Sequence, residues 1–266
     1  MISTQFAISK TERDLTLGTL LRWTLIVAAV LAVIVQPLFE EWQMVAVGVL
    51  VAIGVIWMVL GVGSLRRASS GATSLIAAGE FDLAEGRIAD ALGSFSLFRM
   101  TKLMCLHDLA VLRHAQNRWQ ESAILCRALL NLRPISQAGI DRSSRLILAE
   151  SLLELNDLPG VHENLAALYN QRLSLRQALG LMGVQVDYLS RVGEWNQIFA
   201  GVATKTELAE LLPSSQSARV QALMGLAAQK INRMDWRDWL RRRVELLADV
   251  HKLCADRPIL WELWRS

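Results

Sequence analysis

Two long apolar runs stand out near the beginning of the chain. Residues 23–39 and 43–63 contain no charged side chain, and a short acidic turn at 40–42 separates them. An α-helix rises 1.5 Å per residue, so about 20 residues cross the roughly 30 Å hydrocarbon core of a bilayer. The second run has that length, and the first is slightly shorter. The pattern therefore predicts a transmembrane helical hairpin at residues 22–65.

The charges that flank this hairpin predict its orientation. Basic residues lie before the first run and after the second, whereas the turn carries only the acidic pair Glu40 and Glu41. The positive-inside rule therefore places both termini in the cytoplasm. A signal peptide is the weaker interpretation, because no small-x-small cleavage site precedes the turn and a second apolar run follows. The residues expected at the membrane interface are Arg22, Trp23, Trp42, Arg66 and Arg67.

The segment before the hairpin, residues 1–21, has the composition of a polar cytoplasmic arm. Thr11 and Asp14 have the spacing of a capping box, which predicts that the first helix begins near Glu12.

A helical pattern with a regular break follows the hairpin, from residue 66 to residue 266. Prolines are few and no strand-like alternation occurs, so we expect an all-α fold. Each break holds a Gly or Asn, a polar residue and a bulky apolar residue, and it recurs every 37 to 39 residues. A Gly or Asn at such a position ends a helix in the left-handed conformation. The five break residues are Gly79, Asn117, Asn156, Gly193 and Asn232.

The repeated units resemble tetratricopeptide repeats over about residues 65–253, and the second unit illustrates the match. The matching residues are Leu106, Leu109, Ala110, Asn117, Trp119, Ser122 and Pro134. The resemblance implies that an α-solenoid of about five helix–turn–helix repeats follows the predicted hairpin. The last repeat of such a stack has an open apolar face, so we expect residues 258–266 to form a C-terminal capping helix. The chain departs from the family in its period, near 38 residues rather than 34, and in Arg113, which stands where an aromatic residue is usual. An irregular helical bundle is the alternative.

A stack of this kind implies a concave groove that binds an extended peptide or a partner helix. The repeat alignment places Arg113, Arg145 and Gln185 in that groove, and two arginines favour an acidic partner segment.

Residues 234–243 combine two tryptophans with several arginines, a composition that suits contact with anionic lipid or an acidic partner. The candidate contact residues are Arg237, Arg241, Arg242 and Arg243. The favoured interpretation, however, is a buried stripe whose solvated side carries the arginines. That stripe would consist of Trp236, Trp239, Leu240, Val244 and Leu247.

Composition narrows the function classes. The chain is 53% hydrophobic and carries a net charge of +3, a near balance that is atypical of nucleic-acid binders. It has no P-loop, no dinucleotide-binding glycine motif and no nucleophile elbow, and its four histidines lack metal-ligand spacing. The three cysteines are scattered without a CxxC pair. We therefore expect no catalysis, no cofactor, no metal, no nucleic acid and no small-molecule substrate.

These patterns together predict a membrane-anchored scaffold or adaptor that recruits or assembles partner proteins. Its partners would be other proteins and the lipid bilayer. The alternative is a structural or accessory subunit of a larger membrane complex, with the hairpin packed against the helices of other subunits.

Overall fold

The structure is a computed structural model, and every regular element in its described part is a helix. It describes residues 2–38, 43–68, 71–96, 98–132 and 139–265, without the side chains of residues 35–38, 43 and 61–68. The chain folds as two units, Met1–Ile147 (unit 1) and Leu148–Ser266 (unit 2). The all-α prediction is therefore confirmed for the described residues.

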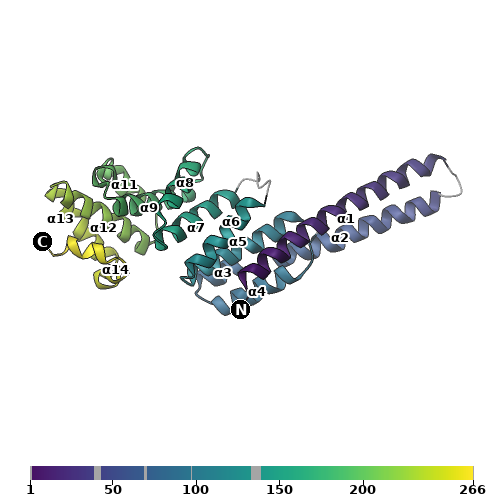
Figure 1. Ribbon diagram of the computed structural model, residues 1–266, viewed down its shortest axis with the longest axis horizontal. Coiled ribbons are helices and arrows are strands. Elements are labelled where there is room, and N and C mark those ends of the chain that lie inside the picture. The colour runs from purple at the N-terminus through teal and green to yellow at the C-terminus, as the bar shows by residue number, and fades with distance from the viewer. Residues whose placement is uncertain (1, 39–42, 69–70, 97, 133–138, 266) are drawn as a thin grey trace. The chain divides into compact units, whose positions relative to one another are not determined.

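The helices follow one another along the chain with short connections (Figure 1). They are α1 (Thr4–Leu38), α2 (Gln43–Ala68), α3 (Ala72–Ala77), α4 (Phe81–Gly93), α5 (Arg99–Ala115), α6 (Trp119–Asn131), α7 (Ile140–Glu154), α8 (Leu158–Tyr169), α9 (Leu175–Val192), α10 (Trp195–Phe199), α11 (Val202–Ala209), α12 (Ser214–Lys230), α13 (Met234–Leu247), α14 (Val250–Asp256) and the 3-10 helix η2 (Pro258–Leu263).

All five predicted breaks adopt the left-handed conformation. The φ angles are 80° at Gly79, 60° at Asn117, 58° at Asn156, 83° at Gly193 and 62° at Asn232. At each break the following N–H donates to the carbonyl five residues earlier, as in the Schellman motif. The prediction of five helix–turn–helix breaks is therefore confirmed.

The fourth unit is less regular than the others. Its second helix, α10, ends at Phe199, and Gly201 takes a left-handed φ of 66° before the chain continues as α11. The expected single helix is thus two short ones. A left-handed residue inside the segment breaks the hydrogen-bond ladder that one continuous helix needs.

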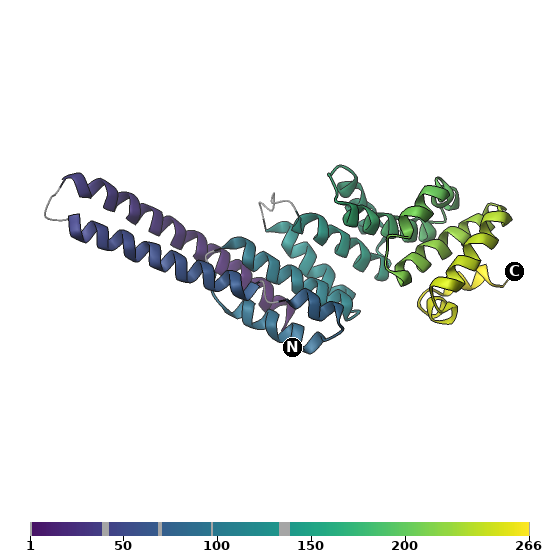
Figure 2. The same cartoon turned by 180° about the vertical axis from the view of Figure 1, so that it is seen from behind.

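In unit 1, α1 and α2 lie side by side and run in opposite directions (Figures 1 and 2). α1 is a single helix of 35 residues that begins at Thr4. The predicted start near Glu12 is wrong. Thr11 lies inside the helix, where its hydroxyl donates to the Ala7 carbonyl at 2.7 Å, so it cannot cap a helix end.

The core of unit 2 is built around α12. Leu240 and Val244 of α13 and Leu260 and Leu263 of η2 are fully buried in the same cluster. Gly225 of α12 allows this close approach, since a Cβ there would lie 3.3 Å from Leu263 and 3.4 Å from Leu240. The terminal apolar residues thus close the core of unit 2, as their composition suggested.

Candidate functional site

The first half of α1 packs into unit 1 through a stripe of small side chains. Ala7, Thr11, Asp14 and Gly18 recur on one face of the helix and are buried. Along its length α1 packs against α4, α5 and α6 as well as α2. Residues 1–21, predicted as a separate arm, are therefore largely part of the folded unit, from residue 2 onward.

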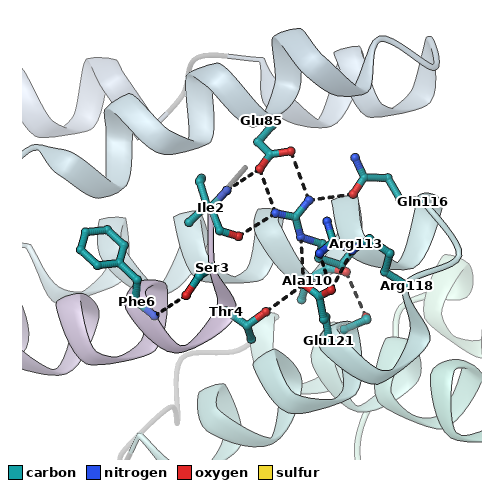
Figure 3. Close-up of polar contacts among 11 residues, drawn as sticks. Ile2, Ser3, Thr4, Phe6, Glu85, Ala110, Arg113, Gln116, Arg118 and Glu121 are labelled. Carbon is teal, nitrogen blue, oxygen red and sulfur yellow. Dashed lines mark hydrogen bonds and ion pairs between the residues drawn. The ribbon is translucent and has the colours of Figure 1, made fainter.

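Arg113 of α5 is the centre of a buried polar cluster that holds the start of α1 (Figure 3). Its guanidinium donates to both carboxylate oxygens of Glu85 on α4, at 2.9 and 3.2 Å. It also donates to the Ile2 carbonyl at 2.9 Å, while the Ile2 N–H donates to Glu85 at 2.6 Å. One ion pair between two helices therefore binds both polar groups of a single backbone residue.

Glu121 of α6 extends the same cluster toward α1. Its carboxylate accepts a hydrogen bond from the Thr4 hydroxyl at 2.9 Å, lies 3.5 Å from Arg113 Nε and pairs with Arg118. Gln116 accepts another bond from Arg113 at 2.7 Å. α4, α5 and α6 thus each contribute a charged side chain to the buried polar cluster that binds the N-terminal end of α1 (Figure 3).

A second buried ion pair joins α1 to α5 three turns further along. Lys102 is 1% exposed, and its Nζ lies 2.7 Å from Asp14 Oδ2. The same ammonium donates to the Leu92 carbonyl at 2.7 Å and to the Ser94 carbonyl. These carbonyls end α4, so Lys102 satisfies a helix end and an acidic side chain of α1 at once.

The electrostatics of the cluster favour its charged form. Hydrogen bonds from Arg113 lower the pKa of Glu85 from 4.5 to about 2, although burial acts in the opposite direction. Glu85 is therefore ionised at neutral pH, and the pair is a true ion pair. The cluster therefore has a structural role, because its charged groups bind one another and the N-terminal end of α1.

Arg113 consequently does not occupy an open groove, as the repeat alignment predicted. Its side chain is 0% exposed, and the chain's own Ile2 lies where a partner would have to bind. The other two predicted groove residues remain candidates. Arg145 is half-buried on α7 and lies 3.4 Å from Asp141, and Gln185 is half-buried on α9 in unit 2.

The four arginines of α13 differ from one another. Arg237 pairs with Asp238 at 2.6 Å, Arg241 pairs with Glu245 at 3.2 Å, and Arg243 binds Gln221 and Glu210. Arg242 is exposed. The expected basic patch is therefore largely neutralised by neighbouring acids. These acids are Asp238, Glu245 and Glu210.

The buried stripe predicted for α13 is present in part. Leu240 and Val244 are fully buried, and Trp236 and Leu247 pack against the same core. Trp239 is 43% exposed and does not belong to the stripe. It precedes Leu240 by one residue, which turns it about 100° away around the helix.

The structure describes the side chains of only two of the five predicted membrane-interface residues. Trp23 is 64% exposed and Arg22 is half-buried, both on α1. Trp42 and the side chains of Arg66 and Arg67 lie outside the described part of the structure.

Beyond Arg22 the two helices of the hairpin turn apolar side chains outward. The exposed ones are Trp23, Ile26, Val27, Val30, Leu31, Val33 and Ile34 on α1 and Met44, Val45, Val47, Val49, Val51, Val55, Ile56, Met58 and Val59 on α2. Among the described residues one helix, Thr4–Ile34, is long and apolar enough to cross a membrane, while Met44–Leu60 of α2 is shorter. The first predicted span is thereby supported, and the second span and the orientation stay predictions.

A serine and a histidine that meet in unit 1 do not form an accessible nucleophile. His107 Nδ1 lies 3.1 Å from Ser144 Oγ, and Asp108 is its neighbour in sequence. Ser144 is fully buried, so its hydroxyl has no surface for a substrate. Burial lowers the pKa of His107 to about 4 and raises that of Asp108 to about 6. Among the described residues no three His, Cys, Asp or Glu side chains gather as a metal site.

Unit 2 contains an ion network that the sequence analysis missed. Asp187 of α9 is 1% exposed and contacts Arg191, Arg219 and Arg257. Glu154, the last residue of α7, binds Arg257 and lies 3.7 Å from Arg191. The network joins α7, α9, α12 and the start of η2. No local pattern indicates it. Except for the i, i+4 pair on α9, its ion pairs join residues that are 32 to 103 positions apart in the sequence.

Comparisons of the chain with protein-family models, with curated proteins and with solved structures gave no significant match. The function is therefore inferred from the geometry of the chain itself.

Proposed function

We propose that the protein is a membrane-anchored scaffold. In this proposal the α1–α2 hairpin crosses the bilayer twice, and the repeats from residue 66 to 266 form a tetratricopeptide-like stack in the cytoplasm that binds and assembles partner proteins. The observation that carries the proposal is the continuity of α1. One helix contains both the buried stripe that packs on α4, α5 and α6 and the apolar side chains that are exposed further along.

This continuity favours a scaffold over a simple tether. A tethered domain needs only a flexible linker between anchor and fold, whereas here the anchor helix is itself part of the fold of unit 1. Two buried ion pairs, Arg113–Glu85 and Lys102–Asp14, fix its position along the helix axis. A binding domain that is held rigidly on its membrane helix is preorganised, so less conformational entropy is lost when a partner binds.

The five left-handed turns support the repeat part of the proposal. They recur with the same hydrogen bond from the residue after the turn to the carbonyl five residues earlier. Each turn pairs two helices whose apolar faces need a neighbour, which is the physical basis of stacked helical repeats.

One observation favours the alternative of a subunit in a larger membrane complex. Gly48 and Ala52 are one helical turn apart and both exposed on α2, and a Cβ at Gly48 would meet nothing within 4 Å. Small residues with this spacing let another transmembrane helix approach closely.

Two experiments test the proposal. The native cysteines are buried, so Glu41→Cys and Arg265→Cys can be labelled selectively with a membrane-impermeant maleimide. We expect Glu41→Cys to react in intact cells and Arg265→Cys only after lysis. Reaction of both in intact cells would refute the proposed topology.

Exchange of the hairpin separates scaffold from subunit. The apolar segments after Arg22 are replaced by an unrelated transmembrane hairpin, while the buried stripe of α1 is kept. Retained partner proteins, identified by mass spectrometry after mild detergent extraction, indicate a scaffold whose repeats bind them. Their loss indicates a subunit whose membrane helices form the interface.

A further inference from the structure

Several helix ends of unit 1 meet beside α1, on the side where α1 continues into its apolar segment. Lys102, near the start of α5, pairs with Asp14 of α1 and donates to two carbonyls at the end of α4. Arg99, the first residue of α5, donates to the Leu132 carbonyl just beyond α6 at 3.1 Å. The end of α4, the start of α5 and the end of α6 therefore form one surface, the hairpin-side end of unit 1. The rest of the hairpin projects beyond it (Figures 1 and 2).

This end lies close to the level at which α1 becomes apolar. Asp14 and Trp23 are nine residues apart on α1, about 13.5 Å, and Lys102 and Phe98 are four residues apart, about 6 Å. α5 runs antiparallel to α1, because its other end binds Ile2 through Arg113. Its start is thus about 7.5 Å from the level of Trp23. The headgroup layer of a bilayer is about 5 to 7.5 Å thick on each side, so a hydrocarbon core that begins at Trp23 puts this end among the headgroups.

The charges at this end are all basic. The parts of α1, α2, α4, α5 and α6 that meet there belong to residues 15–39, 43–79, 91–104 and 122–140, which contain no Asp or Glu. The basic residues in these stretches are Arg22, Arg66, Arg67, Arg99, Lys102, Arg127 and Arg133. Lys102 is neutralised by Asp14. The remaining arginines match the clusters of four to eight basic residues beside a membrane helix that attract anionic lipid.

The connection between α4 and α5 adds aromatic side chains to the same end. Phe95 and Phe98 are both half-buried, and they flank Ser96, whose hydroxyl accepts a hydrogen bond from the Phe98 N–H at 3.0 Å. On α1, Leu17 and Leu20 are 48% and 65% exposed between Asp14 and the apolar segment. Apolar groups beside basic ones suit the boundary between lipid headgroups and acyl chains.

We infer that the hairpin-side end of unit 1 binds the headgroups of anionic phospholipids around the hairpin. Arg22 and Arg99 pair with lipid phosphates, and Phe95 and Phe98 contact the top of the acyl chains. The inference rests on the proposed function and deepens it by naming the lipid. An acidic soluble protein fits this end less well, because exposed apolar side chains of α1 continue up to it and lipid adjoins them.

Fluorescence quenching tests the inference on the full-length protein in vesicles of equal parts phosphatidylcholine and phosphatidylglycerol. Gly93 and Gly86 lie seven residues apart on α4, both exposed, and a Cβ at either meets nothing within 4 Å. They therefore share one face of the helix at two depths. Because the native cysteines are buried, Gly93→Cys and Gly86→Cys can each carry a maleimide fluorophore. The quencher is a nitroxide near the top of an acyl chain, on either of the two lipids.

We expect the probe at position 93 to be quenched about tenfold more strongly by labelled phosphatidylglycerol than by labelled phosphatidylcholine. The probe at position 86, about 10.5 Å further from the bilayer, should be quenched by neither. Equal quenching at the two positions would show that this end does not lie on the membrane. Equal quenching by the two lipids at position 93 would show that it has no preference for anionic lipid. Either result overturns the inference.

Substitutions of the arginines provide the second arm. Arg99→Gln keeps a donor for the Leu132 carbonyl but removes the charge, and it should lower the preference for phosphatidylglycerol about fivefold. Arg22→Gln, on a different helix, should lower it as well. Arg99→Lys retains the charge and is the matched control, which should stay close to wild type. An unchanged preference in both glutamine variants would contradict the role of these two arginines.

A probe in the hairpin distinguishes this inference from the proposed function. Val30 of α1 is 51% exposed, and a fluorophore at Val30→Cys reports contact with brominated acyl chains. If position 30 is quenched by these chains but position 93 shows no preference for anionic lipid, the hairpin crosses the bilayer and the inference alone fails. If position 30 is not quenched, the hairpin does not enter the bilayer and both fail.

Discussion

In each unit a terminal segment of the chain covers the helix–turn–helix pairs. The contacts that hold this segment are polar in unit 1 and apolar in unit 2. In unit 1 the first helix of the chain is locked against α4, α5 and α6 by two buried ion pairs, Arg113–Glu85 and Lys102–Asp14. In unit 2 the last helices are covered by the apolar side chains of Leu260 and Leu263. The turns are alike because they depend on local residues, whereas the covering elements come from the two ends of the chain.

The polar closure of unit 1 has a physical reason. α1 is apolar over most of its length, and a uniformly apolar helix packs almost as well when it slides by one turn. Buried ion pairs are costly to desolvate, but they specify a single register, as a buried polar residue does in a coiled coil. The C-terminal cap of unit 2 needs no such device, because Gly225 accepts it at one position through close contact with Leu263 and Leu240.

The largest effect is expected when one partner of the buried Arg113–Glu85 ion pair is removed. Arg113→Met leaves the Glu85 carboxylate without its buried partner and should lower the free energy of unfolding of unit 1 by about 4 kcal/mol. Urea titration of the detergent-solubilised protein, followed by proteolysis of residues 2–18, measures this loss.

The control for this prediction is the double variant Arg113→Met with Glu85→Gln, which removes both charges and should recover part of the loss. If Arg113→Met unfolded at the wild-type urea concentration, the ion pair would not be what holds α1.

A cavity in the apolar contacts of η2 should lower the stability of unit 2. Leu260 is fully buried, so Leu260→Ala should lower the free energy of unfolding of unit 2 by about 3 kcal/mol. Hydrogen exchange of α12 and α13 reports the change, while α5 and α6 in unit 1 should exchange as in the wild type. Ile259 is 38% exposed, and Ile259→Ala serves as the control with a smaller effect. Equal effects of the two variants would refute the capping role of η2.

Two carboxyls, Glu85 in unit 1 and Glu150 in unit 2, should contribute to the pH dependence of stability with opposite signs. The pKa of Glu85 lies at about 2, below its ordinary 4.5, so its contribution to stability is present above pH 4.5 and is lost as the pH falls toward 2. Burial raises the pKa of Glu150 in unit 2 to about 7, so its contribution is present below pH 4.5 and is lost as the pH rises through 7.

Hydrogen exchange of each unit between pH 3 and 8 tests these signs. Glu85→Gln should remove part of the acid dependence of unit 1, and Glu150→Gln should flatten the loss in unit 2 near pH 7. The same pH profile in wild type and variants would show that these two carboxyls do not set the difference.

Much of the local structure could be predicted from the sequence. A Gly or Asn before a bulky residue marks a helix end, and all five such positions are left-handed. The apolar runs likewise identify α1 and α2 by composition alone. These features depend on residues a few positions apart, which is the range that sequence patterns cover.

The closure of unit 1 could not be predicted in the same way. Arg113 meets Ile2 across 111 residues, and nothing in the local pattern indicates that contact. One signal was available. Arg113 lies four residues before its turn, where the other units have Leu75, Leu152, Leu189 and Ala228. A charge at a position that is otherwise apolar indicates a buried partner at least as well as a binding groove, and here the buried partner is present.

The smallest effect is expected at the left-handed turns, a type of turn that occurs in both units. Asn117 in unit 1 and Asn232 in unit 2 hold φ near 60°, a conformation that costs an alanine about 1 kcal/mol. Asn117→Ala and Asn232→Ala should each lower the free energy of unfolding of their own unit by that amount, as measured by hydrogen exchange of the adjoining helices. Glycine adopts this conformation freely, so Asn117→Gly and Asn232→Gly should stay close to wild type. Equal losses in both units would confirm that the turn is a local device, whereas a loss confined to unit 1 would mean that its turn depends on the buried cluster around Arg113.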